Sequence, residues 1–249
     1  MDSQAASEDA QAFINRLKGA GDLRVWSVIV TIMGDMARAP GETVSGTTLG
    51  ALMGAMGIRP EATRVALHRL RKDGWITSER VGRGSHHALT DYGREQTLAV
   101  VDRVYGPDVP VPAKWYLVIS VPGGPSCMPT ELTDEGFIQI APNTFLGATP
   151  PDPTRDLVCF SDATPRIPDW ICAKILQPEL QQDILDLSAA LDEFSQLDTA
   201  NEPSLIRAAL RSLIVHRWRR IALKLPKLPL SILKPGAYLH TQINEFLVR

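Results

Sequence analysis

The sequence predicts an α+β protein in three parts, and three observations carry this prediction. The first hundred residues show helical patterns followed by one short hairpin pattern. The middle begins after three prolines within residues 106–112 and contains short β-prone runs. The remainder returns to amphipathic helical spacing. We therefore expect domains at residues 1–105, 113–176 and 177–249.

Charge is distributed unevenly along the chain of 249 residues, whose formal net charge is −2. Residues 101–200 carry 5 Lys and Arg against 15 Asp and Glu, whereas residues 201–249 carry 9 against 2. Residues 58–94 carry eight basic side chains against four acids. Because salt screens charges beyond about 10 Å, a locally basic segment can attract phosphates in spite of the net charge. The distribution favours separate roles for the parts.

The composition is that of an ordinary globular protein, with 44% hydrophobic and 22% charged residues. No apolar run approaches the ~18 residues that a membrane span requires. The first residues are acidic where a secretory signal is basic, and no apolar run follows them. Cys127, Cys159 and Cys172 lack metal-ligand spacing. We therefore expect a cytoplasmic protein with reduced structural thiols and no membrane contact.

Helical spacing and turn residues define the elements of the first hundred residues. Helices are expected over 8–18, 23–36, 46–56 and 60–73, the last opening with a proline that a first helical turn tolerates. Strands over 75–80 and 85–89 flank Gly82-Arg83-Gly84, which predicts a hairpin, and a further helix is expected over 90–105. The order helix, helix, turn, helix and hairpin is that of a winged helix-turn-helix.

The helix over 60–73 has the composition of a helix that reads the major groove of double-stranded DNA. An α-helix fits this groove, and an outward arginine can pair with guanine through two hydrogen bonds. The inward residues are expected to be Val65, Ala66, Leu70 and Ala62. The outward residues are expected to be Thr63, Arg64, Leu67, His68 and Arg71, with Arg69 and Lys72 placed for backbone phosphates.

Arg80 and Arg83 bracket the glycine turn of the hairpin and are expected to contact a phosphate or the minor groove. His86 and His87 lack further metal ligands nearby, which favours a wing contact or a solvated pair over a metal site. The alternative for the whole segment is a surface helix with solvated arginines. The preceding helices and the arginine-bearing hairpin favour DNA binding.

The middle and the end of the chain predict further elements. Strands are expected over 115–121, 136–140, 144–148 and 157–160, with the second and third pairing around Ala141-Pro142-Asn143. Helices are expected over 177–195, after Pro203 as a long amphipathic helix, and over 238–248.

Several stretches resemble the PaaX family of repressors of phenylacetate degradation: residues 24–35 (RVWSVIVTIMGD), 64–76 (RVALHRLRKDGWI), 89–93 (LTDYG), 213–220 (LIVHRWRR) and 225–229 (LPKLP). The resemblance implies a dimeric repressor that binds an operator and is released by an aryl-acetyl-CoA thioester. It also implies a ferredoxin-like central domain, similar to the fold of CRISPR-associated RNA-cleaving proteins. Residues 122–135, rich in Pro and Gly, depart from the basic helix that the family has there.

The segment from His216 to Arg220 is the candidate effector site outside the DNA-binding part. Arg219 and Arg220 could meet the phosphates of a CoA-like effector, with Trp218 stacking on a ring. In the alternative, Trp218 packs in the core and the arginines pair with the acidic middle of the chain.

Two other functions are open to this sequence. A metal-dependent nuclease built on the central domain would need a carboxylate at the end of its first strand, but that strand ends in Ser120-Val121-Pro122-Gly123-Gly124. The acids of residues 179–198 alternate with apolar residues and indicate a solvated helix face. We therefore expect no catalytic residue, metal or cofactor. The second alternative is a winged domain that binds a partner protein, which an absence of salt-dependent DNA binding would favour.

Overall fold

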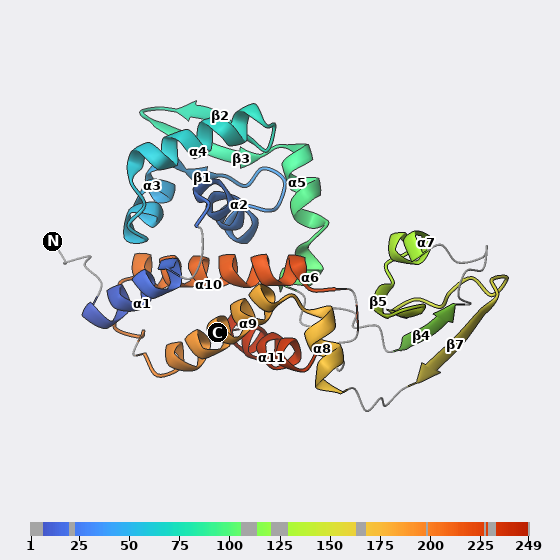
Figure 1. Ribbon diagram of the computed structural model, residues 1–249. Helices are drawn as coiled ribbons and strands as arrows, with labels where there is room; N and C mark the ends of the chain where they lie inside the picture. The colour runs from blue at the N-terminus through green and yellow to red at the C-terminus, as the bar shows by residue number, and fades with distance from the viewer. Residues whose placement is uncertain are drawn as a thin grey trace. The chain divides into compact units, whose positions relative to one another are not determined.

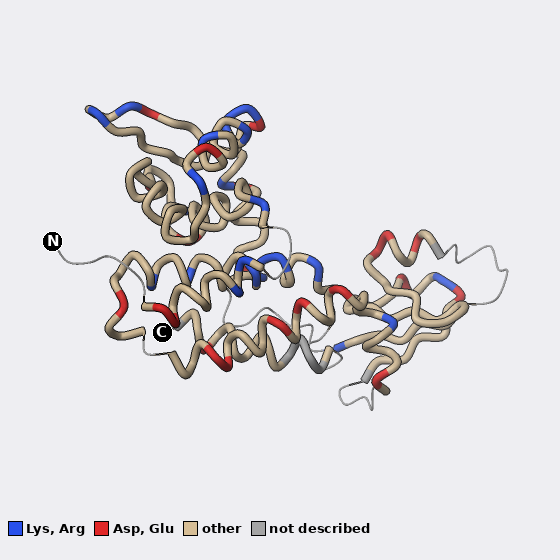
Figure 2. The backbone as a smooth tube through the Cα atoms, turned by 60° about the vertical axis from the view of Figure 1, so that its left-hand side comes forward, with Lys and Arg blue, Asp and Glu red and all other residues tan. Residues whose placement is uncertain are grey.

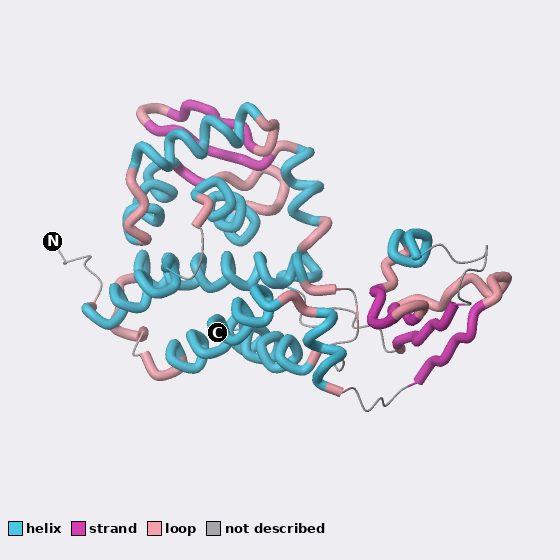
Figure 3. The backbone as a smooth tube through the Cα atoms, in the orientation of Figure 1, coloured by secondary structure: helices cyan, strands magenta, loops and turns pink. Residues whose placement is uncertain are grey.

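The computed structural model describes residues 7–19, 23–105, 114–120, 129–162, 168–197, 199–226, 228 and 233–248. The chain forms two compact units, each assembled from two stretches of sequence. Unit 1 comprises residues 1–106 and 189–223, and unit 2 comprises residues 107–188 and 224–249. Helices and antiparallel sheets occur together, so the protein is α+β as expected (Figures 1 and 3). The predicted three-domain division stays a prediction, and its proline-rich boundary at 106–112 lies outside the described residues.

Unit 1 begins with four helices that agree with the predicted ranges to within two residues: α1 (Glu8–Gly19), α2 (Val25–Met36), α3 (Gly46–Ala55) and α4 (Pro60–Lys72). α2 is an interior helix, in which Val28, Ile29, Ile32 and Met33 are all fully buried. α3 begins after Ser45, whose hydroxyl accepts a hydrogen bond from a backbone N–H in the first turn. The cap of α3 and the buried apolar residues of α2 therefore account for two of these helices from local sequence.

A three-stranded antiparallel sheet has the order β1-β3-β2, with β1 (Val44–Ser45), β2 (Ile76–Val81) and β3 (Gly84–Leu89). β2 and β3 form the predicted hairpin. Gly82 and Arg83 make its two-residue turn, and the φ of 61° at Gly82 is a conformation that favours glycine. β1 was not predicted, because two residues are too few to show an alternating pattern.

The helix predicted over 90–105 is interrupted, giving α5 (Asp91–Leu98) and α6 (Val101–Tyr105). The hydroxyl of Thr90 caps α5 by accepting a hydrogen bond from the Gly93 N–H at 2.9 Å. A Cβ on Gly93 would overlap the carbonyl oxygen of Trp75. Glycine therefore permits α5 to approach the start of the hairpin closely.

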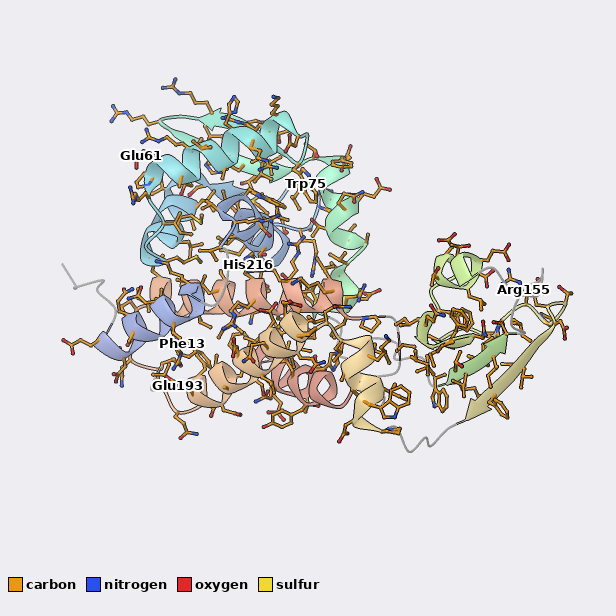
Figure 4. All side chains as sticks on the ribbon, viewed as in Figure 1. Phe13, Glu61, Trp75, Arg155, Glu193 and His216 are labelled. Carbon is orange, nitrogen blue, oxygen red and sulfur yellow. The ribbon has the colours of Figure 1, made fainter. Side chains whose placement is uncertain are left out.

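Helix α10 (Ser204–Lys224) completes unit 1, to which its residues 204–223 belong. Its middle is buried continuously from residue 212 to residue 218. Three polar pairs join α2 to α10: Ser27 with Arg219, Thr31 with His216, and Asp35 with Arg211. The three α2 residues are spaced by four, so they form one polar stripe along the helix. Figure 4 shows His216 on the side of α10 that faces α2.

Unit 2 contains a four-stranded antiparallel sheet of order β5-β6-β4-β7, with β4 (Trp115–Ser120), β5 (Ile138–Ala141), β6 (Thr144–Gly147) and β7 (Leu157–Asp162). The strands lie where β-prone runs predicted them. Asn143 has a φ of 55° in the turn between β5 and β6. The short helix α7 (Pro129–Asp134), which was not predicted, contributes Leu132 to a core with Val118, Phe137 and Phe145.

The remaining helices are α8 (Asp169–Ile175), α9 (Pro178–Phe194) and α11 (Lys234–Val248). α8 was not predicted, and α11 begins four residues earlier than predicted. Residues 178–188 of α9 belong to unit 2, where the Ser188 hydroxyl donates to Gln242 of α11 at 2.6 Å. Residues 189–194 belong to unit 1, where the rings of Phe194 and Phe13 lie 5.8 Å apart.

Candidate nucleic-acid interface

Helix α4 has a buried face and an exposed basic face. Thr63, Ala66 and Leu70 are buried at a spacing of three and four residues, which places them on one side of the helix. The exposed side chains are Pro60, Glu61, Arg64, Val65, His68, Arg69, Arg71 and Lys72. All the charged residues predicted to contact DNA from this helix therefore project into solvent, and Leu67 is half-buried.

Two orientations predicted for α4 are wrong. Thr63 was expected outward but is 7% exposed, and its hydroxyl donates to the carbonyl oxygen of Arg59 at 3.3 Å. Val65 was expected inward but is 70% exposed. Ala66 and Leu70 fix the buried face, and Thr63 lies on it three residues before Ala66. Hydrophobicity alone misled the prediction, because valine is the more apolar of the two.

Ion pairs involve some of the arginines of α4. Arg64 lies 2.7 Å from Glu61, and both side chains are largely exposed, so the pair adds little stability. Hydrogen bonding to its own backbone N–H, and then Arg64, lower the pKa of Glu61. Arg69 lies 3.5 Å from Asp73. Among the described residues, Arg71 and Lys72 have no ion-pair partner. α4 thus presents several cationic groups to an external anion.

The tip of the hairpin adds two exposed cations. Arg80 and Arg83 lie beside the two-residue turn, and the Arg80 Nε donates to the Gly82 carbonyl oxygen at 3.4 Å. Figure 2 shows Lys and Arg along α4 and at the tip of the β2–β3 hairpin. Figure 4 shows Glu61 near the start of α4, pointing away from the body of the unit.

The two neighbouring histidines of β3 differ in environment. His87 is 4% exposed, and its Nδ1 lies 2.8 Å from the Ser78 hydroxyl across the sheet. Burial, then the charges of Arg71 and His86, lower the pKa of His87. The expectation of a wing contact or a solvated pair is therefore wrong for His87, whose buried ring contacts Ser78 across the hairpin. His86 is half-buried.

The candidate effector residues on α10 are distributed between the core and its edge. Trp218 is 2% exposed, and its Nε1 donates to the Val104 carbonyl oxygen at 3.0 Å. The ring therefore has no face free for a ligand, and its predicted stacking role is wrong for this conformation. Arg219 and Arg220 are half-buried, and burial lowers the pKa of Arg219.

Cation-binding and membrane-spanning features give no additional candidates. No three His, Cys, Asp or Glu side chains in the described ranges are grouped so that they could hold a metal ion. Cys159 is exposed as a free thiol and Cys172 is buried, whereas Cys127 lies outside the described residues. None of the helices in the described part of the chain is long and apolar enough to cross a membrane.

Comparisons with known proteins are consistent with the sequence resemblance. Residues 24–93, which contain α2 to α4, the three-stranded sheet and the start of α5, match the family model described as PaaX-like protein. The Transcriptional repressor PaaX of Escherichia coli (strain K12) is 26% identical over 250 residues, covering 89% of this chain and 78% of that protein. A solved structure, Uncharacterized protein Rv0674 from Mycobacterium tuberculosis, is 17% identical with a TM-score of 0.46, covering 91% of this chain and 95% of that one.

Proposed function

We propose that this chain is a PaaX-like transcriptional repressor that binds double-stranded operator DNA, as its match to the PaaX-like family model and its similarity to the repressor of Escherichia coli suggest. One observation carries the proposal beyond the family relation. The exposed basic face of α4 and the basic hairpin tip both lie inside residues 24–93, the segment that matches the family model.

The proposed mode of binding is that of a winged helix-turn-helix. α4 would enter the major groove, where Arg64, His68 and Arg71 would reach base edges. Arg69 and Lys72 would contact backbone phosphates, as would Arg80 and Arg83 at the tip of the wing. Thr63 is withdrawn from this set, because a buried side chain bonded to its own helix cannot reach a base. Leu67 would support the helix rather than read sequence.

The test is a titration of the promoter region beside the gene for this chain, by fluorescence anisotropy at two salt concentrations. Arg71→Ala and Arg64→Ala are each expected to weaken specific binding by about 1–3 kcal/mol. Lys72→Ala is expected to weaken binding to all sequences and to reduce the salt slope by about one. Lys174→Ala, which removes an exposed lysine of α8 in unit 2, is the matched control and should change nothing.

The result that sinks the assignment is unchanged affinity in both arginine variants. If the protein shows no salt-dependent DNA binding at all, the alternative of a winged domain that binds a partner protein takes its place. Cleavage of DNA or RNA on addition of Mg²⁺ or Mn²⁺ would favour the nuclease alternative, which the relation to a repressor does not favour.

We further propose that the protein acts in the cytoplasm as a homodimer released by a small effector such as an aryl-acetyl-CoA thioester. The support is the family relation, together with the two-fold symmetry common to operators. Arg219 and Arg220 are the proposed partners of the effector phosphates, without Trp218. Effector and DNA then weaken each other's binding by the same factor. A panel of thioesters added to the protein–DNA complex, and the molar mass of the free protein in solution, test these two points.

A ferredoxin-like topology is proposed for the central part of unit 2. Its support is the sheet order β5-β6-β4-β7, with α7 between the first two strands in sequence. The loop between β6 and β7 takes the place of a second helix.

A further inference from the structure

Val65 is an exposed aliphatic residue in the middle of a charged helical face. Residues Glu61, Val65, His68 and Lys72 are spaced by four, three and four, so they share the side of α4 opposite Thr63, Ala66 and Leu70. The valine side chain is 70% exposed, one of the highest values among the large hydrophobic residues. It stands directly beside Arg64, which the proposed function directs to the bases.

Neither folding nor solubility favours valine at this position. A β-branched side chain loses χ1 freedom in a helix and is a poorer helix former than the Ala, Arg, Lys and Leu around it. Its exposure means that little apolar surface is removed from water in the free protein. The stabilising contribution of Val65 is therefore small, and its side chain remains available for contact with another molecule.

The major groove contains one apolar group that a valine can contact. Guanine, cytosine and adenine present hydrogen-bond donors and acceptors there, whereas thymine adds a C5-methyl group. We infer that Val65 is a specificity-determining residue that reads the methyl group of a thymine in each operator half-site. This inference rests on the proposed function, since it requires that α4 lie in the major groove.

The surroundings of Val65 fit this assignment. Arg64 is held by Glu61 at 2.7 Å on the adjoining part of the face, and His68 follows one turn later. These polar groups can bond to the donors and acceptors of neighbouring base pairs, and the aliphatic side chain of Val65 lies beside His68 on the same face. Contact between the valine and the thymine methyl group would remove the apolar surface of both from water. This would favour thymine over the other bases without any hydrogen bond.

The experiment replaces thymine with deoxyuridine, which lacks only the C5-methyl group. The operator is first located by footprinting of the promoter region beside the gene. Duplexes of the protected region are then made with each thymine replaced in turn. The wild-type protein is expected to lose affinity by about fourfold at one thymine of each half-site, the factor for one buried group of CH₂ size. The other replacements within the groove contacted by α4 should have no such effect.

Two variants test whether Val65 is the cause of the fourfold loss of affinity. Val65→Ala is expected to bind thymine and deoxyuridine duplexes equally at the sensitive position, because its shorter side chain no longer reaches the methyl group. Leu98→Ala removes another exposed aliphatic side chain, from α5, and should retain the fourfold discrimination. Neither variant should lower the thermal midpoint, since both side chains are exposed, and Val65→Ala should keep or slightly raise it because alanine is the better helix former.

The outcomes distinguish a failure of the role proposed for Val65 from a failure of the proposed repressor function. Specific, salt-dependent binding with no deoxyuridine-sensitive position overturns the role of Val65 and leaves the repressor. Discrimination that persists in Val65→Ala also overturns it. A lack of any sequence-specific binding overturns the proposed function and this inference together.

Discussion

His216 makes the stability of unit 1 depend on pH in a way that can be worked out from its surroundings. The imidazole is 1% exposed, and its Nδ1 lies 3.2 Å from the Thr31 hydroxyl, which itself donates to the Ser27 carbonyl oxygen at 3.0 Å. Burial, followed by the charges of Arg220 and Arg219, lowers the pKa of His216 from 6.5 to about 4. The folded protein therefore holds this histidine in its neutral form.

The sign of the effect follows from proton binding in the two states. Between the two pKa values the unfolded chain binds a proton that the folded chain does not, so unfolding becomes easier as the pH falls. The stability associated with neutral His216 is fully present above the unfolded pKa of 6.5 and is lost progressively down to about 4. Between about pH 7.5 and about pH 5 this amounts to roughly 2 kcal/mol.

The assay is urea unfolding followed by circular dichroism at these two pH values, for the wild type and for His216→Asn. All other titrating groups are common to both proteins, so the difference isolates residue 216. The wild type is expected to lose about 2 kcal/mol more than the variant on acidification. The His216 Cε1–H resonance should also remain unshifted down to about pH 5. Parallel losses in the two proteins, or a resonance that titrates near 6.5, would refute the reasoning.

Two further predictions concern packing within unit 1. Trp218→Phe removes the donor to the Val104 carbonyl oxygen and part of a buried ring, and should lower the free energy of unfolding by about 1–3 kcal/mol, measured by urea denaturation with an unchanged m-value. An unaltered midpoint would show that this ring does not anchor α10. Gly93→Ala should cost about 2–3 kcal/mol because its Cβ would overlap the Trp75 carbonyl oxygen, whereas Gly50→Ala, with no neighbour within 4 Å on α3, should be neutral or stabilising. Equal thermal midpoints for the two alanine variants would contradict this.

Local signals account for the elements that could be predicted from the sequence. Pro60 marks the start of α4, and Gly82 marks the turn of the β2–β3 hairpin. Both features lie where the sequence predicted them. Strand β1 and helix α8 were missed, because they are too short to display a period. Exposed basic residues of α4 could also be predicted, since charge and periodicity suffice to place arginine outside.

Burial determined by distant parts of the chain could not be predicted. Thr31 and His216 are 185 positions apart, and no local pattern indicates that they meet in a buried contact. The polar residues that flank Trp218 suggested a ligand site. The helix to which they belong, α10, is instead part of the same unit as the N-terminal helices, and its middle is buried there. Thr63 and Val65 were exchanged because each residue has the polarity opposite to that of the face on which it lies, and Ala66 and Leu70 determine which face is buried.

The discontinuity of unit 1 has a consequence for its synthesis. Residues 107–188 separate its two stretches, and a ribosome adding about 5–20 residues per second needs roughly 4–16 s to translate them. During that interval α2 has been made but α10 has not. The stripe of α2 that later meets α10 consists of Ser27, Thr31 and Asp35, which water can solvate in the nascent chain. Until α10 has been made, water therefore hydrates these side chains. A polar stripe at this position reduces the apolar surface that the unfinished unit 1 exposes to other nascent chains.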